Sequence, residues 1–247
     1  MSDSYSPAGQ PVGPPVDSRP ADLPQAVTLC GRYGAVERLN PSKHGASLWQ
    51  TVSGHDRLWT YMAHGPFADE AAFRDWLASR QVLADPCFYA VVEPGGRATG
   101  LITLCSIRPD MRVVEVGHIL FAPSLQRTAL ATEAQYLLAR YAFEALRYRR
   151  YEWKCDALNA ASRRAALRLG FSFEGTFRNH MIVKGRSRDS AWFAMLEDAW
   201  PARKAALERW LAVENFAEGS QKQTLAELQA DLQVPFEVVA GRGLAST

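Results

Sequence analysis

The residues best suited to hold a ligand lie in one stretch, from Val113 to Gly175, where an apolar strand runs into a loop of small residues that opens a long helix. The loop spans residues 126–131 and reads QRTALA. Such a loop leaves backbone N–H groups facing outward at the positive end of the helix dipole, where a phosphate group binds well. From the loop alone, an ordinary tight strand-to-helix turn fits equally well.

A second strand and a short helix complete this stretch. Asn159 is a good N-cap for a helix over 160–169, and Gly170 followed by Phe171 fits a Schellman ending, in which the apolar residue folds back. Ser162 lies in the first turn, where its hydroxyl either caps the helix or faces a ligand, directly or through water. Both segments therefore place polar groups at the start of a helix that follows a strand.

The elements that position these groups follow from apolar periodicity and turn residues along the chain. Strands are expected at 26–39 (a pair or one bent strand), 88–92, 98–107, 112–121, 151–156, 172–174 and 191–196. Helices are expected at 41–49, 69–79, 130–145, 160–169 and 197–213. Short links predict an antiparallel meander for the three middle strands, and the long helix then predicts a strand-helix-strand crossover. The last two strands are expected to pair.

Length and composition bound the class of protein. With 247 residues, of which 47% are hydrophobic, the chain can bury one sizeable core. A formal charge of +2 is too small to indicate general binding to nucleic acid. The five histidines lack the paired spacing of a metal site. No apolar run approaches the roughly 18 residues of a membrane span, and the N-terminus does not resemble a signal peptide. The expected location is cytoplasmic, with four cysteines that pack in the core: Cys30, Cys87, Cys105 and Cys155.

The two ends of the chain differ in composition from its middle. Six prolines among Ser, Gly and Asp leave residues 1–25 with too little apolar surface to offset the entropy of ordering, so a disordered arm is predicted. Beyond Phe216 the sequence turns polar, with one weak amphipathic segment through Leu225, Leu228 and Leu232. The expected organisation is one domain over 26–213, followed by a peripheral tail over 214–247.

Taken together, these motifs resemble the GNAT acyl-CoA N-acyltransferase superfamily, most closely the branch of the ribosomal-protein N-terminal acetyltransferases. The resemblance is strongest from about Val113 to Leu196. The superfamily loop Gln/Arg-x-x-Gly-x-Gly/Ala is matched as Gln126-x-x-Ala129-x-Ala131, with alanine in place of the first glycine. The NxxS start of the second helix, its GF ending and the FEG that follows resemble the same branch in order and spacing.

The resemblance implies an α/β (α+β) fold whose mixed, mostly antiparallel central sheet of about seven strands is flanked by helices. In such a fold a splayed strand pair forms the acetyl-CoA groove, and the small loop residues let the backbone approach the pyrophosphate. The implied contacts to acetyl-CoA are Ile119, Leu120, Phe121, Gln126, Arg127, Thr128, Ala129, Leu130, Ala131, Thr132, Asn159, Ser162 and Arg164. For Arg164, like Arg163 and Arg168, a solvated basic helix face is the competing explanation.

The reaction of the superfamily is direct attack of an amine on the thioester, so the resemblance implies a base for the amine and a proton donor for the thiolate. Glu115 lies eleven residues before Gln126, a separation at which some members place a general-base glutamate, and His118 is the other titratable candidate. In a regular strand these two side chains point to opposite faces, unless a bulge changes the parity. A role in orienting the strand is the alternative for both.

The proton donor common in the superfamily is replaced in this sequence. Many members have a tyrosine four residues before the glycine that ends the second helix, and that position is Ala166. The ribosomal-protein branch has a serine three residues after the asparagine, which corresponds to Ser162. The resemblance therefore implies Ser162 as the donor.

The acceptor is less constrained than the cosubstrate. A basic loop between the last two strands suits an acidic or carbonyl-rich acceptor or is simply solvated: His180, Lys184, Arg186, Arg188 and Asp189. Four aromatic residues either line an acceptor cleft or pack in the core: Trp49, Trp59, Tyr61 and Phe67.

The resemblance thus implies an acetyl-CoA-dependent N-acetyltransferase that uses no metal. The acceptor would be a primary amine, with a protein N-terminus as one possibility. The alternatives are a small amine such as an antibiotic or metabolite, or a non-catalytic acyl-CoA-binding module, as Ala129 and Ala166 suggest. Neither nucleic acid nor membrane is expected as a partner, and a homodimer is possible.

Overall fold

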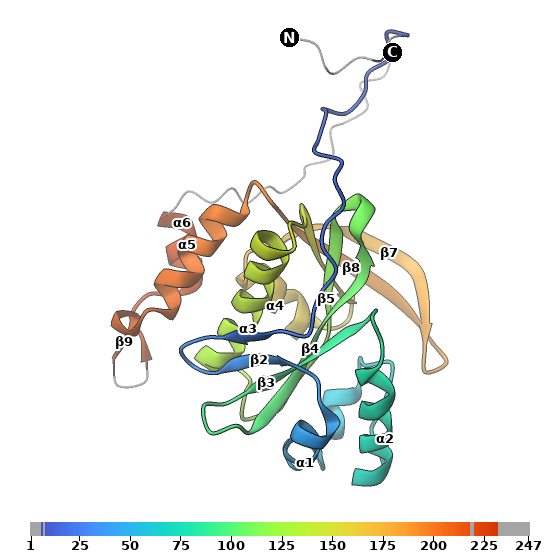
Figure 1. Ribbon diagram of the computed structural model, residues 1–247, viewed down its shortest axis with the longest axis vertical. Coiled ribbons are helices and arrows are strands. Elements are labelled where there is room, and N and C mark those ends of the chain that lie inside the picture. Colours follow the sequence, from blue (N-terminus) through green and yellow to red (C-terminus); the bar gives the residue numbers. More distant parts are fainter. Residues whose placement is uncertain (1–5, 7, 218–219, 232–247) are drawn as a thin grey trace.

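A computed structural model describes residue 6, residues 8–217 and residues 220–231 (Figure 1). Eight strands form one mixed sheet in the order β1-β2-β3-β4-β5-β6-β8-β7. These strands are β1 (Thr28–Cys30), β2 (Ala35–Arg38), β3 (Cys87–Val92), β4 (Ala98–Arg108), β5 (Val113–Phe121), β6 (Arg150–Asp156), β7 (Ser172–Val183) and β8 (Arg186–Leu196). A separate two-stranded ribbon pairs β9 (Phe216–Ala217) with β10 (Ser220–Gln221).

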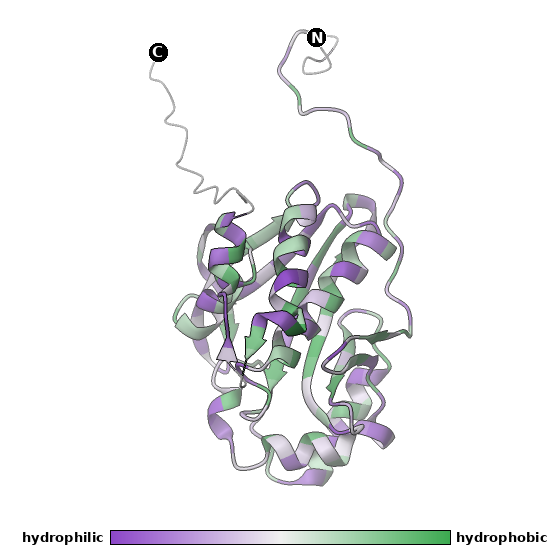
Figure 2. Ribbon diagram, turned by 90° about the vertical axis from the view of Figure 1, so that its left-hand side faces the viewer, coloured by the Kyte–Doolittle hydropathy of each residue, from purple (hydrophilic) through white to green (hydrophobic). Residues whose placement is uncertain are grey.

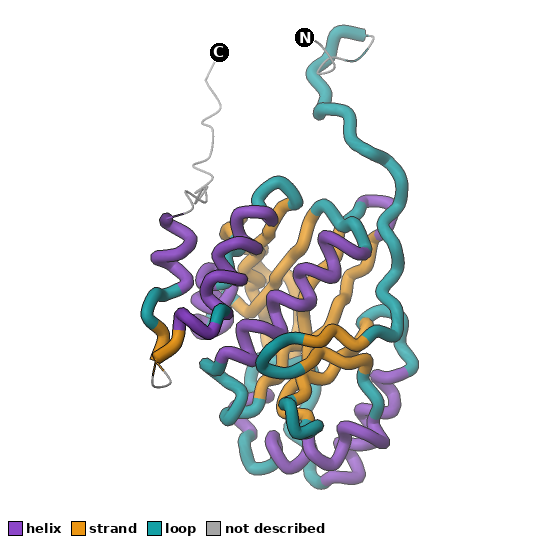
Figure 3. The backbone as a smooth tube through the Cα atoms, turned by 60° about the vertical axis from the view of Figure 1, so that its left-hand side comes forward, coloured by secondary structure: helices purple, strands orange, loops and turns teal. Residues whose placement is uncertain are grey.

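Helices cover both faces of the sheet (Figure 3). The α-helices are α1 (Pro41–Val52), α2 (Glu70–Gln81), α3 (Ala129–Arg140), α4 (Ala160–Arg168), α5 (Trp200–Leu211) and α6 (Leu225–Asp231). Short 3-10 turns occur at η1 (Asp56–Trp59), η2 (Pro109–Met111) and η4 (Val213–Asn215), and α3 ends in a π-helical turn, η3 (Tyr141–Ala145). Helices α1 and α2 pack on one face around Leu48, Phe73 and Leu77, whereas α3 to α6 pack on the other.

Apolar residues gather on the strands and on the helix sides that meet them (Figure 2). Helices α2 and α4 each begin at a residue whose side chain caps the first turn. Asp69 Oδ1 accepts from the N–H of Ala72 at 2.8 Å, and Asn159 Oδ1 accepts from the N–H of Ser162 at 3.0 Å. Helix α4 ends in the predicted Schellman motif, in which Gly170 has a φ of +96° and the N–H of Phe171 donates to the carbonyl of Ala166 at 3.1 Å.

The sheet topology confirms the predicted meander and crossover. Strands β3, β4 and β5 are antiparallel neighbours, and β6 returns parallel to β5 after α3. The parallel pairing extends over four residue pairs, from Val113 with Arg150 to Val116 with Trp153. Beyond these pairs β5 continues to Phe121 and β6 to Asp156 without pairing to each other. The two strands therefore splay apart, as the resemblance implied.

The last two strands pair as predicted but are longer than expected. They form an antiparallel hairpin whose turn is Lys184-Gly185, so the residues expected in a polar loop lie mostly on strands. Strand β7 is the edge of the sheet and most of its side chains are exposed. It therefore lacks the apolar alternation by which a strand is recognised in a sequence.

Both ends of the chain contact the domain where they are described. Ala21 is buried, and the N–H of Gln25 donates to Tyr141 Oη at 2.9 Å. At the other end Leu225 and Leu228 are 1% exposed and belong to the core on the α5 side, so this part of the tail is not peripheral. Residues 1–5 and 7 of the predicted arm, and 218–219 and 232–247 of the predicted tail, including Leu232, lie outside the described residues.

Candidate active site

Two cavities meet where β5 and β6 splay apart. The larger cavity, of about 1340 Å³, lies between residues 54–63, β5, β6 and the β7–β8 hairpin. The smaller cavity, of about 980 Å³, lies between the loop that precedes α3 and helix α4. Both are lined by the same seven residues at their junction: Leu58, Ile119, Gln126, Trp153, Asn159, Ala161 and Ser162. Ligands bound in the two cavities would therefore meet at Ser162.

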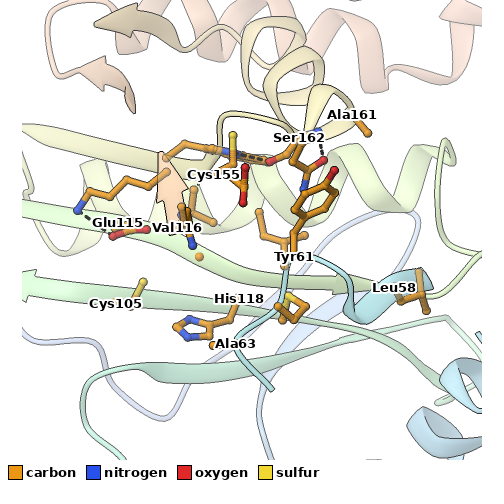
Figure 4. Close-up of a pocket in the computed structure, with 18 of the residues that line it drawn as sticks. Leu58, Tyr61, Ala63, Cys105, Glu115, Val116, His118, Cys155, Ala161 and Ser162 are labelled. Carbon is orange, nitrogen blue, oxygen red and sulfur yellow. Dashed lines mark hydrogen bonds and ion pairs between the residues drawn. The ribbon is translucent and has the colours of Figure 1, made fainter. Parts of the chain in front are cut away.

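A β-bulge shapes β5 at this junction. Leu120 pairs with Leu101, but Gly117 pairs with Thr103, so one residue too many lies on β5 between these pairs. His118 has a φ of +46°, in the left-handed region that β-strand residues normally avoid. The bulge reverses the alternation of side chains along β5. It thereby puts His118 on the same face as Glu115, and both line the larger cavity (Figure 4).

Glu115 is held by charges and hydrogen bonds from neighbouring strands. Its Oε2 accepts from Ser106 Oγ at 2.9 Å and lies 3.0 Å from Lys154 Nζ. Lys154 also pairs with Glu152 at 3.1 Å, and its ammonium lies 4.0 Å from the centre of the Trp192 ring. These contacts involve Oε2, whereas Oε1 faces Gly117, because a Cβ added there would lie 3.5 Å from it. The carboxylate is thus oriented with one oxygen toward the bulge.

His118 lies in a less polar environment. Its Nδ1 is 3.3 Å from Thr103 Oγ1, and its ring packs 5.4 Å from that of Phe88. Burial lowers the pKa of His118 to about 4, and the positive charge of His64 and Arg80 acts in the same direction. The imidazole is therefore neutral near pH 7.

Ser162 has a defined hydrogen-bond geometry. Its Oγ accepts from the indole N–H of Trp153 at 3.0 Å, which leaves its own hydroxyl hydrogen for another acceptor. Cys155 lies beside it (Figure 4), with a pKa that burial raises and the Ser162 hydroxyl lowers. Ala166 is fully buried in the core below, at the position where the resemblance would place a tyrosine.

The loop before α3 offers free donors to the smaller cavity. Thr128 caps α3, because its Oγ1 accepts from the N–H of Ala131 at 3.1 Å, while its own N–H donates to the carbonyl of Leu125. Among the described residues, no acceptor is found for the N–H groups of Arg127, Ala129 and Leu130. The lining includes three arginines and no acidic residue: Arg127, Arg164 and Arg168. This combination suits a phosphate-bearing ligand.

The predicted site residues are largely brought together. Glu115, His118 and Ser162 all line the larger cavity. All the residues predicted to contact acetyl-CoA line the smaller cavity except Leu130, whose side chain is buried in the core. Of the predicted aromatic residues, Tyr61 lines the larger cavity, whereas Trp49, Trp59 and Phe67 belong to the α1–α2 core or pack against it.

Sequence reasoning missed the contribution of β6. Trp153, Lys154 and Cys155 form one wall of the larger cavity, and Trp153 and Lys154 bond to residues predicted to be functional. The sequence showed these positions only as a buried strand. One signal could have identified them. They lie on the strand next to β5, and side chains on a strand that separates from its neighbour border the opening between the two.

Comparisons with known proteins agree on one family. The pattern described as Acetyltransferase (GNAT) domain matches residues 38–172. The crystal structure of a GCN5-related N-acetyltransferase from Brucella melitensis superposes with a TM-score of 0.84 at 44% identity, covering 86% of this chain and 98% of that one. A probable acetyltransferase of the GNAT family from Chromobacterium violaceum superposes with a TM-score of 0.73 at 40% identity, covering 79% of this chain and all of the other.

One curated relative carries a more specific name. The provisionally named ribosomal N-acetyltransferase YdaF of Bacillus subtilis (strain 168) is 29% identical over 163 residues, which are 62% of this chain and 85% of that protein. The described residues include no helix long and apolar enough to cross a membrane. Nor do they contain a group of three or more His, Cys, Asp and Glu side chains that could hold a metal ion.

Proposed function

The chain belongs to the GNAT family of N-acetyltransferases, and we propose that it uses acetyl-CoA to acetylate a primary amine at the junction of its two cavities. The observation that carries the proposal is the set of seven residues shared by the two cavities. An acyl transferase without a covalent intermediate must bring donor and acceptor together, and the shared lining provides one place where they meet.

The smaller cavity fits acetyl-CoA, the cosubstrate of this family. Its three arginines and the free N–H groups of Arg127, Ala129 and Leu130 match a pyrophosphate and a further phosphate. Ile119 and Phe121, on the splayed part of β5, would hold the pantetheine arm. When bound, acetyl-CoA supplies an acetyl group that is activated as a thioester.

The larger cavity supplies the groups that handle protons. We assign Glu115 as the acceptor of the amine proton, directly or through water, because its Oε1 faces the bulge while Oε2 is held by Lys154 and Ser106. His118 is neutral and forms part of the wall. Ser162, fixed by Trp153, donates a hydrogen bond to the leaving thiolate and passes it a proton that is replaced from solvent.

We further propose that the acceptor amine is a protein N-terminus. The name of the Bacillus relative refers to a ribosomal acceptor, and a protein N-terminus is compatible with it. The larger cavity is open and spacious enough for several residues of an extended chain. An α-amino group also has a pKa near 8, so roughly a fifth to a third of it is neutral at about pH 7.4 and a strong base is not needed.

The test has two steps. Acetyl-CoA should raise the melting temperature, because a ligand at 100 times its Kd adds about 2.7 kcal/mol to the free energy of unfolding. Thiol release should then be measured with peptides bearing free N-termini and with small amines, and the products identified by mass. Absence of stabilisation would contradict the cosubstrate assignment, and turnover confined to small amines would contradict the acceptor assignment.

A further inference from the structure

Among the residues that the structure describes, one half-buried cation of the larger cavity has no carboxylate partner. Arg188, on β8, is half-buried and lines this cavity. In the part of the chain that the structure describes, no carboxylate oxygen lies within 4.0 Å of its guanidinium, and its Nε is buried without a hydrogen-bond partner. A buried N–H donor without an acceptor is costly, and a ligand in the cavity could supply that acceptor.

Of the other charged groups around the cavity, Asp56 and Arg57 are exposed to solvent, and the rest are engaged with the protein. Lys154 is paired with Glu115 and Glu152 and lies over the Trp192 ring. Asp85 Oδ2 accepts from the N–H of Ile107 at 3.0 Å, and Asp156 Oδ1 from the N–H of Leu158 at 2.8 Å. Arg188 therefore differs from Lys154 in that its charge is left for something that enters the cavity.

A second donor without a partner lies on the same strand. The indole Nε1 of Trp192 is buried and has no acceptor among the described residues, and Trp192 also lines the larger cavity. Burial is the main cause of the lowered pKa of His118, and the positive charge of Arg188 lowers this pKa further. Burial also raises the pKa of Cys155, and the charge of Arg188 partly offsets this rise. Arg188 is thus near the groups that border the junction.

We propose that Arg188 binds a carboxylate of the acceptor, so that the preferred acceptor carries both an amine and a carboxylate. This inference rests on the proposed function. The amine would lie at the bulge near Glu115, and the carboxylate toward β8. The two ends of such an acceptor match the two charges that face the cavity, because a guanidinium can bind a carboxylate through two parallel hydrogen bonds.

The carboxylate can be an acidic side chain near a protein N-terminus or the end of a short peptide, and two pairs of probes separate these sources. The first pair is Ala-Glu-Ala-Ala amide with Ala-Gln-Ala-Ala amide, and the second is Ala-Gly with Ala-Gly amide. Within at least one pair, kcat/KM for thiol release should be about 10- to 100-fold higher for the acid than for the amide, the range expected for hydrogen bonds to a charged group.

The variants test whether Arg188 causes this preference. Arg188→Gln should bring the acid-to-amide ratio close to 1, and Arg188→Lys should retain part of it, because the charge remains but the paired donors are lost. The matched control is Arg186→Gln, at an exposed position of the same hairpin that does not line the cavity, and it should keep the wild-type ratio.

Several results would overturn the inference. They are equal kcat/KM for acid and amide in both pairs, or a preference that survives in Arg188→Gln. Absence of turnover with all four peptides, in a protein that acetyl-CoA stabilises, would overturn it as well. If kcat/KM is the same for the amides and the acids, the proposed function stands and this inference alone fails. If acetyl-CoA neither stabilises the protein nor is consumed with any amine, the proposed function fails first.

Discussion

Replacing Ser162 with alanine tests the proposed proton donor. The leaving group is a thiol, whose pKa is about 8.5 in water. At pH 7, about 1.5 units below this pKa, the thiolate is higher in free energy than the protonated thiol. This difference corresponds to about 2 kcal/mol, or roughly 30-fold in rate, and sets the most that a donor can contribute at that pH. We therefore expect Ser162→Ala to lower kcat by up to about 30-fold at pH 7 and by less at pH 9.

The same variant should also lower stability for a separate reason. It leaves the buried indole N–H of Trp153 without the acceptor that now lies 3.0 Å away, at a cost of about 1–3 kcal/mol. Trp153→Phe removes the donor instead. The double variant should therefore lose less stability than the sum of the single losses, as measured by chemical denaturation.

The assay is kcat for thiol release from pH 7 to pH 9, with acetyl-CoA affinity measured in parallel from thermal stabilisation. The affinity should change less than kcat, because the hydroxyl acts on the leaving group rather than on the phosphates. An unchanged kcat at pH 7, or a defect of the same size at both pH values, would refute the assignment of Ser162 as donor.

Three further predictions concern β5. Glu115→Gln should lower kcat/KM by about 100-fold or more, the range expected for loss of a general base, and an unchanged kcat/KM would exclude Glu115 from this role. Because the pKa of His118 is about 4 in the folded protein and about 6.5 when unfolded, the unfolded chain binds more protons between these values, and stability should fall by up to about 3 kcal/mol as pH drops from 6.5 to 4. His118→Gln should flatten this dependence in denaturation curves, whereas the exposed His55→Gln should not. Gly117→Ala should cost about 1–3 kcal/mol, because the new Cβ would lie 2.7 Å from Cys105 Sγ, and Cys105→Ala should restore most of the loss of melting temperature.

Local signals were sufficient for much of the fold. Asn159 and Gly170 mark helix ends in the sequence because capping depends on residues within one turn, and the structure places both as predicted. The loop before α3 was equally recognisable, because small residues between a strand and a helix form a local pattern. The order of the central strands followed from the lengths of the links between them.

What the sequence did not reveal depends on contacts between distant residues. The bulge that turns His118 toward Glu115 is visible only in the register of β4 against β5. The hydrogen bond from Trp153 to Ser162 requires β6 and α4 to meet. The burial of Leu225 depends on the surface of the core that it covers, so a short polar segment with few leucines gave a weak signal.

The splaying of β5 and β6 also has a mechanical consequence. Within the sheet, the five strands from β1 to β5 and the three strands β6, β8 and β7 are joined by four residue pairs. The sheet thus consists of two groups of strands with a short connection, and a ligand in the gap would contact both groups. Loading the groove should stiffen the scaffold itself rather than a surface loop. Slower amide hydrogen exchange in β5 beyond Val116 and in β6 beyond Trp153 would then show that the bound ligand reduces local opening of the two strands.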